Sequence, residues 1–297
     1  MKAKIDGLIQ LTHTREYSYF VLATSLVGIA AADGQFGVRF VLVLAANWLM
    51  AGFAFMLNDV QDAPYDAFNQ EEARRNPVSA GLISTSDAKI ATCLTALVAL
   101  ILYAVLGWKV LLCGLASLGV GILYSHRSVR VKTVALLDLV SHCWLLAGLF
   151  MMSGYFAFQG QWSQELLFPF LMVVCLSLYG ELSNELRHLQ SQPLCTNRYT
   201  LFFLGEKVTH IVMILLLTVG SISGVLTLFF QKLVPLWVVV LIVILSGILI
   251  LPALLKMSRS QSALEMQMSF YKPLEKAAAL ALLVYYLTPI VINLFTH

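Results

Sequence analysis

Three aspartates are spaced so that an α-helix would bring their carboxylates to one face. Asp59 and Asp62 are three residues apart, Asp66 follows four residues later, and Asn58 precedes the series. Residues at these spacings are neighbours on a helix surface, where like charges repel each other. A divalent cation would remove that repulsion, and Mg²⁺ prefers oxygen ligands, commonly one or two carboxylates together with substrate phosphates. The series therefore indicates either a magnesium site or a solvated polar loop.

A second polar segment, YGELSNELRHLQ, has the same helical spacing. Glu181 and Glu185 are four residues apart, Asn184 directly precedes Glu185, and His188 follows three residues later. The pattern Asn-Glu-x-x-His parallels the Asn-Asp-x-x-Asp of the first series, which indicates a weak internal repeat. Two facing acidic clusters could hold metal ions with a polyphosphate between them.

The elements that must position these clusters are membrane helices. Hydrophobic residues make up 59% of the 297-residue chain, charged residues make up 12%, and the mean hydropathy is +0.83, which is outside the usual range of soluble domains. Nine apolar runs approach the length that crosses roughly 30 Å of hydrocarbon. They lie at about residues 17–32, 38–57, 90–106, 110–124, 134–155, 166–179, 208–230, 234–255 and 277–295. The fourth and sixth runs are short, and we expect the corresponding helices either to gain length from their flanks or to tilt less than the others. We predict an all-α integral membrane protein with nine transmembrane helices.

Basic residues are distributed unequally between the loops that these runs define. Of the 19 Lys and Arg residues, all but Arg39, Lys109 and Lys232 fall on the side of the N-terminus. Cytoplasmic loops of membrane proteins are enriched in Lys and Arg. The N-terminus and both acidic clusters are therefore predicted to face the cytoplasm, and the C-terminus is predicted to face the opposite side of a multi-pass protein. The expected location is a bacterial inner membrane.

With these clusters and helices, the sequence resembles the UbiA superfamily of intramembrane prenyltransferases, whose members have nine transmembrane helices. The family's first motif, NDxxDxxxD, is matched at every fixed position by Asn58 and the three aspartates. RRNPVSAGLIS is similar to the family stretch RP-[IL]-x-x-G-x-[IL]-S, although Asn76 stands where arginine is common. YSHRSVRVK is similar to the segment after the fourth helix. The resemblance covers essentially the whole chain, so a single domain of this type is expected at residues 1–297.

The resemblance implies an enzyme that binds an allylic polyprenyl diphosphate through Mg²⁺ and transfers the polyprenyl group to a lipophilic acceptor in the membrane. We expect this acceptor to be aromatic. The helices would surround a central cavity that opens to the cytoplasmic side. The lipid bilayer is the other expected partner, and neither a nucleic acid nor an obligate protein partner is expected. The residues expected to act in catalysis and metal binding are Asp59, Asp62 and Asp66, joined in metal binding by Glu181 and Glu185. Those expected to bind the substrate are Asn58, Arg75, Tyr124, Arg127, Arg130, Lys132, Asn184 and Arg187.

The second cluster departs from the family pattern. The family's second motif is usually rich in aspartate, but this chain has no aspartate after Asp138. Glu181 and Glu185 keep the DxxxD spacing with a longer side chain, and His188 stands where an aspartate is common. Imidazole suits softer metals better than Mg²⁺, so the second metal site is expected to be weakened, shifted or lost. Arg187 matches an arginine within that motif and favours retained binding of the diphosphate.

Two other functions remain open at this stage. One is a terpene cyclase with the same fold, in which the allylic cation attacks its own double bonds and needs no acceptor. The other is a transporter, for which charged or broken helices would be expected near the membrane midplane, whereas the charges here gather at one interface. An allylic cation also requires aromatic faces. Candidates for these are Trp48, Phe55, Tyr124 and Tyr179, each of which could instead belong to the core or to an interfacial belt.

Overall fold

The computed structural model describes residues 2–158, 161–191, 200–230, 233–256 and 263–295, and within these ranges it contains helices and turns without strands. The long helices are α2 (Thr14–Ala31), α3 (Val38–Asp66), α5 (Thr85–Leu106), α6 (Trp108–Ser125), α9 (Leu167–Ser191), α11 (Glu206–Val225), α12 (Leu236–Lys256) and α13 (Ala263–Phe295). Another long segment consists of α7 (Leu137–His142), a π-helical stretch (Cys143–Gly148) and α8 (Leu149–Phe158). The short helices are α1 (Lys2–Leu11), α4 (Gln70–Arg75) and α10 (Thr200–Leu204).

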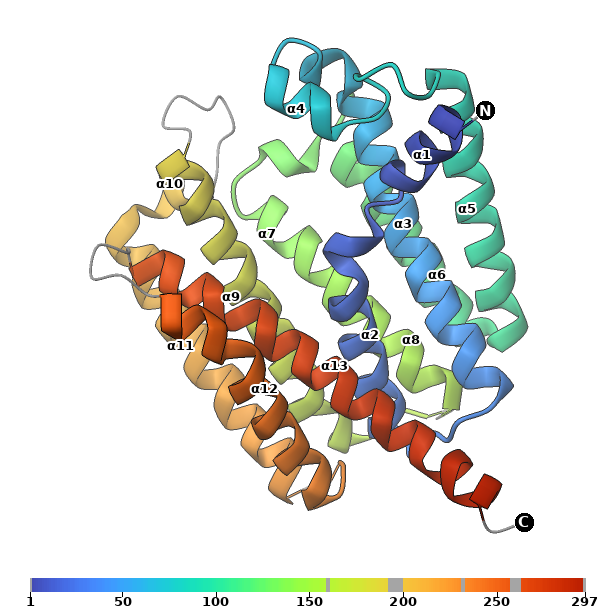
Figure 1. The fold of residues 1–297 in the computed structure, drawn as a ribbon, viewed down its shortest axis with the longest axis vertical. Coiled ribbons are helices and arrows are strands. Elements are labelled where there is room, and N and C mark those ends of the chain that lie inside the picture. Colours follow the sequence, from blue (N-terminus) through green and yellow to red (C-terminus); the bar gives the residue numbers. More distant parts are fainter. Residues whose placement is uncertain (1, 159–160, 192–199, 231–232, 257–262, 296–297) are drawn as a thin grey trace.

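The helices form one bundle with its two chain ends at opposite ends (Figure 1). α3 packs against α5 and α6, α9 packs against α11, and α12 packs against α13. α2 and α8 lie between these groups and contact each other extensively (Figure 1). α1 and α4 lie at the end of the bundle that carries the N-terminus, which is the end predicted to face the cytoplasm.

Helices occupy the positions of all nine predicted apolar runs. In the described part of the chain, seven helical segments are long and apolar enough to cross a membrane, and α2 and α12 are not among them. The fold is thus all-α and membrane-spanning, while the number nine stays a prediction. The fourth and sixth runs do gain length from their flanks. α6 extends beyond the fourth run at both ends, and α9 extends beyond the sixth run at its C-terminal end.

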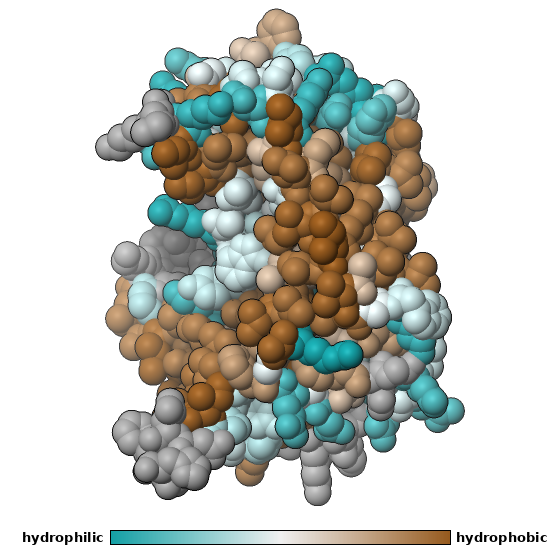
Figure 2. All heavy atoms as spheres, turned by 90° about the vertical axis from the view of Figure 1, so that its right-hand side faces the viewer, coloured by the Kyte–Doolittle hydropathy of each residue, from teal (hydrophilic) through white to brown (hydrophobic). Residues whose placement is uncertain are grey.

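On the face drawn in Figure 2, apolar side chains cover much of the middle of the bundle, and hydrophilic side chains are concentrated at its two ends. Large side chains of α5 are exposed along its length, among them Ile90, Leu94, Ile101 and Val105. An apolar surface of this extent would be unusual on a soluble monomer, whereas a lipid-facing helix is expected to carry one.

Glycines allow α2 and α8 to touch backbone to backbone. A Cβ atom at Gly28 would lie 2.0 Å from the Met151 carbonyl oxygen, and one at Gly154 would lie 2.6 Å from the Ser25 carbonyl oxygen. Small residues at helix interfaces permit this close approach in membranes, where van der Waals packing drives association. Neither glycine could be replaced without separating the two helices.

A buried polar network centred on Asn47 joins four helices of the core. The Asn47 Nδ2 atom donates to Ser25 Oγ at 2.7 Å and to the Phe150 carbonyl at 3.1 Å. Its Oδ1 atom accepts from the hydroxyls of Tyr103 and Ser153, each at 2.7 Å. The amide therefore uses its full capacity of two donors and two acceptor positions. The network fixes how α2, α3, α5 and α8 sit around the helix that carries the aspartates.

Candidate active site at the end of α3

The first acidic series lies on the last turns of α3. This helix continues past the predicted end of its apolar run at residue 57, so Asp59, Asp62 and Asp66 are all helical. Pro64 lies within the last turn, and helix α3 ends at Asp66. The expectation that the carboxylates share one face of a helix is met, because all three residues belong to one continuous helix, in which residues three or four positions apart lie on the same face.

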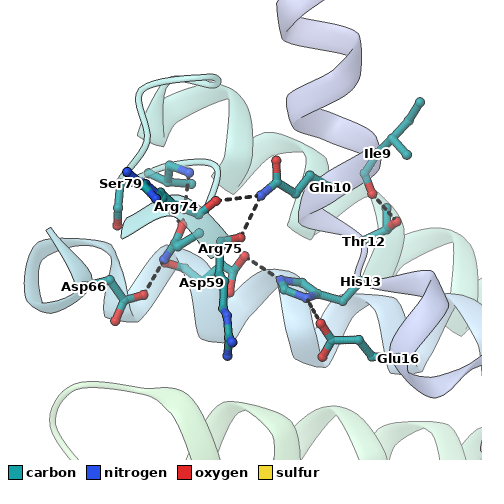
Figure 3. A network of polar contacts seen from close by, with 12 residues as sticks. Ile9, Gln10, Thr12, His13, Glu16, Asp59, Asp66, Arg74, Arg75 and Ser79 are labelled. Atoms are coloured by element: carbon teal, nitrogen blue, oxygen red, sulfur yellow. Dashed lines mark hydrogen bonds and ion pairs between the residues drawn. The ribbon is translucent and has the colours of Figure 1, made fainter. Parts of the chain in front are cut away.

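Asp59 is bound by a histidine from the turn between α1 and α2. His13 Nε2 lies 2.8 Å from Asp59 Oδ2, and His13 Nδ1 lies 3.2 Å from Glu16 Oε1 (Figure 3). Burial disfavours the charged imidazole, but the hydrogen bonds to Asp59 and Glu16 outweigh it and raise the pKa of His13 to about 10. His13 therefore adds a positive charge beside the first aspartate at neutral pH.

Asp62 is paired with two of the basic residues assigned to the diphosphate. Arg130 Nη2 lies 2.9 Å from Asp62 Oδ1, and Lys132 Nζ contacts Asp62 Oδ2. Lys132 also donates to Asn58 Oδ1 at 2.7 Å. Burial lowers the pKa of Lys132, and the neighbouring Asp62 carboxylate opposes this effect. Four residues selected from the sequence are thus brought together in one cluster.

Arg130 is held in place by its backbone and by an aromatic ring. Its φ of 48° and ψ of 52° place it in the left-handed region, which is uncommon for a residue other than glycine. Its guanidinium lies 4.5 Å from the ring centroid of Tyr65, in a cation–π contact. This sharp turn before Val131–Thr133 directs Arg130 and Lys132 toward α3.

Asp66 is oriented by Asn76 from the loop after α4. The Asn76 amide donates to Asp66 Oδ2 and to the main-chain carbonyl of Asp59, both at 2.8 Å. Its Oδ1 atom accepts from the amide of Val78 at 3.0 Å. The residue that departs from the family pattern therefore ties the following loop to the aspartate helix.

Two other predicted residues lie at the edge of this cluster. Arg75 is exposed, its main-chain carbonyl accepts a hydrogen bond from Gln10 at 2.9 Å, and its side chain extends away from Gln10 (Figure 3). Arg127 is also exposed and donates to the Gln61 carbonyl at 3.3 Å. Arg75 is thus bonded through its own main-chain carbonyl and Arg127 to the main-chain carbonyl of another residue, and neither hydrogen bond involves an aspartate carboxylate.

Glu185 of the second cluster is bound to the start of α10. Its side chain is buried, and Oε2 accepts from the amide of Leu201 at 3.0 Å, with a further hydrogen bond to the Thr200 side chain. Burial raises the pKa of Glu185, and these hydrogen bonds oppose the rise. The other oxygen, Oε1, has no hydrogen-bond partner among the residues that the structure describes.

The two clusters share Tyr124 as a neighbour. Tyr124 makes a side-chain hydrogen bond with Asp138 and interacts electrostatically with Glu181 and with Asp62. It is therefore within electrostatic range of one carboxylate from each cluster. The side chains of Asn184, Arg187 and His188 lie outside the described residues, so the structure does not place these parts of the predicted site.

Within the described ranges, no three His, Cys, Asp or Glu side chains come together as a ready metal site. Each α3 aspartate instead has a partner of its own, in His13, in Arg130 with Lys132, or in Asn76.

Sequence reasoning missed His13, Glu16 and Gln10. The available signal was His13 and Glu16 three residues apart just before the first apolar run, where ionisable groups face the membrane interface. Asp59, the partner of His13, and Arg75, the partner of Gln10, are distant in sequence, so these two pairings could not be predicted from residue spacing.

The profile of the UbiA prenyltransferase family matches residues 21–272. The match covers most of the chain, including α3 and its aspartates. The protein belongs to the UbiA prenyltransferase family. No curated protein matches the chain significantly.

Several solved structures share the fold over nearly the full length of both chains. A digeranylgeranylglyceryl phosphate synthase has a TM-score of 0.69 at 17% identity, with 97% of this chain and 100% of that chain covered. A UbiA homologue from Archaeoglobus fulgidus, bound to GPP and Mg²⁺, has a TM-score of 0.66 at 16% identity, with 94% and 99% covered. The apo UbiA homologue from Aeropyrum pernix K1 has a TM-score of 0.70 at 16% identity, with 93% and 98% covered. At these identities the likeness establishes the fold.

Proposed function

We propose that this protein ionises an allylic polyprenyl diphosphate and transfers the polyprenyl group to a lipophilic, aromatic acceptor within the membrane. The observation that carries the proposal is the cluster in which Asp62 holds both Arg130 and Lys132 at the end of a membrane helix. Family membership supports a prenyl-transferring enzyme. Homologues with this fold bind GPP or DMAPP together with Mg²⁺.

The donor set of α3 fits Mg²⁺. Asp59, Asp62 and Asp66 offer carboxylate oxygens only, and such sites commonly bind Mg²⁺ through one or two carboxylates, water and substrate phosphates. This agrees with the lack of a ready three-residue cluster in the described structure. When bound, Mg²⁺ would supply positive charge to the departing diphosphate, where charge develops during ionisation.

Arg130 and Lys132 would bind the diphosphate by exchanging partners. Both cations are partly buried against Asp62, and a buried cation requires a counter-charge. The diphosphate oxygens can replace the Asp62 carboxylate in these charge-assisted hydrogen bonds. Asp62 then becomes available to a metal ion, while neither cation loses its anionic partner. Substrate and metal should therefore bind cooperatively.

Glu181 and Glu185 would complete the site from the opposite helix. Glu185 has one oxygen engaged by Leu201 and one without a partner in the described structure, so it can offer a ligand without leaving α10. Tyr124, which interacts electrostatically with Asp62 and with Glu181, would face the bound substrate. In this proposal the site lies in a central cavity at the cytoplasmic end, the end with α1 and α4.

A terpene cyclase is the second candidate, favoured by the replacement of aspartates by Glu181, Glu185 and His188 in the second motif. Both functions begin with loss of diphosphate and differ in what captures the cation. The test is to incubate the purified protein with Mg²⁺ and prenyl diphosphates of several lengths, with and without aromatic acceptors, and to analyse the products by mass spectrometry. A prenylated acceptor supports the transferase, a cyclic hydrocarbon or cyclic alcohol formed from diphosphate alone supports the cyclase, and no diphosphate release rejects both.

A further inference from the structure

His13 meets the first aspartate from a distant part of the chain. The two residues are 46 positions apart, and His13 Nε2 lies 2.8 Å from Asp59 Oδ2. The opposite ring nitrogen, Nδ1, lies 3.2 Å from Glu16 Oε1. Carboxylates accept hydrogen bonds, so a ring placed between two of them donates from both nitrogens (Figure 3). Glu16 therefore fixes the direction in which His13 donates to Asp59.

The imidazole is also fixed by its surroundings. The side chain of His13 is 14% exposed and that of Asp59 is 10% exposed. The His13 ring stacks on Phe55 with centroids 5.5 Å apart, and Phe55 stacks on Tyr17 at 5.2 Å. Both of these aromatic residues belong to the helices that the histidine joins, so the ring cannot turn without disturbing their packing.

The turn that carries His13 is held against the loop after α3. His13 has a φ of 49°, a conformation that costs energy for a residue other than glycine and persists only when surrounding contacts enforce it. Gln10 supplies such contacts by donating to the main-chain carbonyls of Arg74 and Arg75 at 3.1 and 2.9 Å. Leu11 adds another, because it is fully buried in a cluster with Met56.

We propose that His13, oriented by Glu16, is a positioning residue that fixes the Asp59 carboxylate plane so that its Oδ1 oxygen faces the metal and diphosphate. The inference rests on the proposed function, in which Asp59 is a metal ligand. The terminal torsion of an aspartate is broad, and a hydrogen bond to one oxygen restricts where the other points. Loss of a group that orients a metal ligand typically weakens metal affinity by about 10–100-fold.

The test measures Mn²⁺ binding, by electron paramagnetic resonance, to the full-length protein in detergent with inorganic pyrophosphate present. His13→Leu should weaken Mn²⁺ binding by about 10–100-fold. His13→Gln, which places an amide N–H near the position of Nε2, should stay within about threefold of the wild type, and Glu16→Ala should fall between the two. Arg15→Ala removes an exposed charge from the same turn and serves as the matched control. It should bind Mn²⁺ like the wild type.

The affinity for Mn²⁺ would not change if His13 had a purely structural role. A variant that only folds less well would lose binding sites per mole of protein, while the remaining sites would keep the wild-type affinity. Wild-type affinity in His13→Leu would overturn the inference. Tighter binding in both His13→Leu and His13→Gln would also overturn it, because the ring would then act through charge repulsion of the ion.

Asp59→Asn separates this inference from the proposed function. If Asp59→Asn loses Mn²⁺ while His13→Leu binds normally, the site is a metal site and His13 does not position it. If the wild type binds no Mn²⁺ with or without pyrophosphate, the proposed function fails and the inference fails with it. Weak binding in His13→Leu, rescued by His13→Gln, supports both.

Discussion

Asn76 and Asp66 are joined by a hydrogen bond of 2.8 Å between the side-chain amide and carboxylate, although arginine is common at the position of Asn76 in the family that the sequence resembles. The same amide holds the Asp59 carbonyl, so one buried side chain supports two turns of the aspartate helix. The departure from the family pattern is thus compensated locally, by hydrogen bonding in place of charge.

Asn76→Ala should destabilise the protein by about 1–3 kcal/mol, because it leaves buried groups of Asp66, Asp59 and Val78 without this partner. It should also slow diphosphate release, since Asp66 loses its orientation. The matched control is Asn69→Ala, which removes the N-cap of α4 at a cost of about 1 kcal/mol but does not touch an aspartate. Thermal midpoints in detergent and a pyrophosphate release assay measure both effects. Equal activities in the two variants would show that Asn76 serves the fold alone.

Asp59→Asn and Asp62→Asn should each reduce diphosphate release by roughly a thousandfold, because a metal ligand contributes several kcal/mol to stabilisation of the transition state. Asp87→Asn is the control, since it breaks the surface ion pair with Lys4 on the same side of the bundle. Such exposed pairs contribute at most about 1 kcal/mol. Turnover near the wild-type rate in either site variant would contradict the metal-diphosphate mechanism.

Lys132→Met should raise the KM for the diphosphate by about 10–100-fold, because it removes a charge-assisted hydrogen bond, which is worth about 1.5–3 kcal/mol. Arg127→Met should raise it only about twofold to threefold, since the exposed Arg127 side chain contacts a carbonyl and its charge is screened. Initial rates at varied diphosphate and saturating Mg²⁺ provide the comparison. A larger effect at Arg127 than at Lys132 would assign the diphosphate to a different part of this loop.

Glu185→Gln should raise the Mg²⁺ concentration for half-maximal activity, because it removes the charge that we propose the second cluster offers to an ion. His188→Asp, which restores the residue common in the family, should keep activity and lower the Mg²⁺ requirement. A Mg²⁺ titration at fixed diphosphate tests both variants. An unchanged Mg²⁺ dependence in Glu185→Gln, together with loss of thermal stability, would leave Glu185 only as the anchor of α10 through Leu201.

Single cysteines should reveal the orientation when introduced into a chain without its five native cysteines. A cysteine at Gln70, at the start of α4, should resist an impermeant thiol reagent in intact cells, and one at Gln161 should react. The physical reason is the excess of Lys and Arg on the side of Gln70. Permeabilised cells, in which both positions should react, provide the control. Labelling at position 70 from outside would reverse the predicted topology.

The helical positions could be predicted from the sequence because hydrophobicity along a membrane helix is a local property. The sequence predicts the continuation of α3 through Asp66 only conditionally, since polar residues and Pro64 interrupt the apolar run after residue 57 and leave Val60 and Ala63 as the only buried apolar residues of this continuation. The family resemblance predicts that Asp62 lies near Arg130 and Lys132, because it assigns the aspartate to the metal ion and the two basic residues to the diphosphate, but it does not predict their direct ion pairs. The bonds from His13 to Asp59 and from Gln10 to Arg75 could not be predicted, because they depend on how α1 packs against the loop after α3.

Because Gly28 and Gly154 bring α2 and α8 into backbone contact, the chain cannot finish packing in the order in which it is made. α2 is synthesised early, but α8 follows only after α3, α5, α6 and α7, and α13, which also packs on α2, is synthesised last. During that interval the face of α2 that later meets α8 lacks its partner helix. A chain that ends before α13 would leave α2 uncovered on the side that meets α13, and we expect membrane quality-control proteases to degrade it as unfinished.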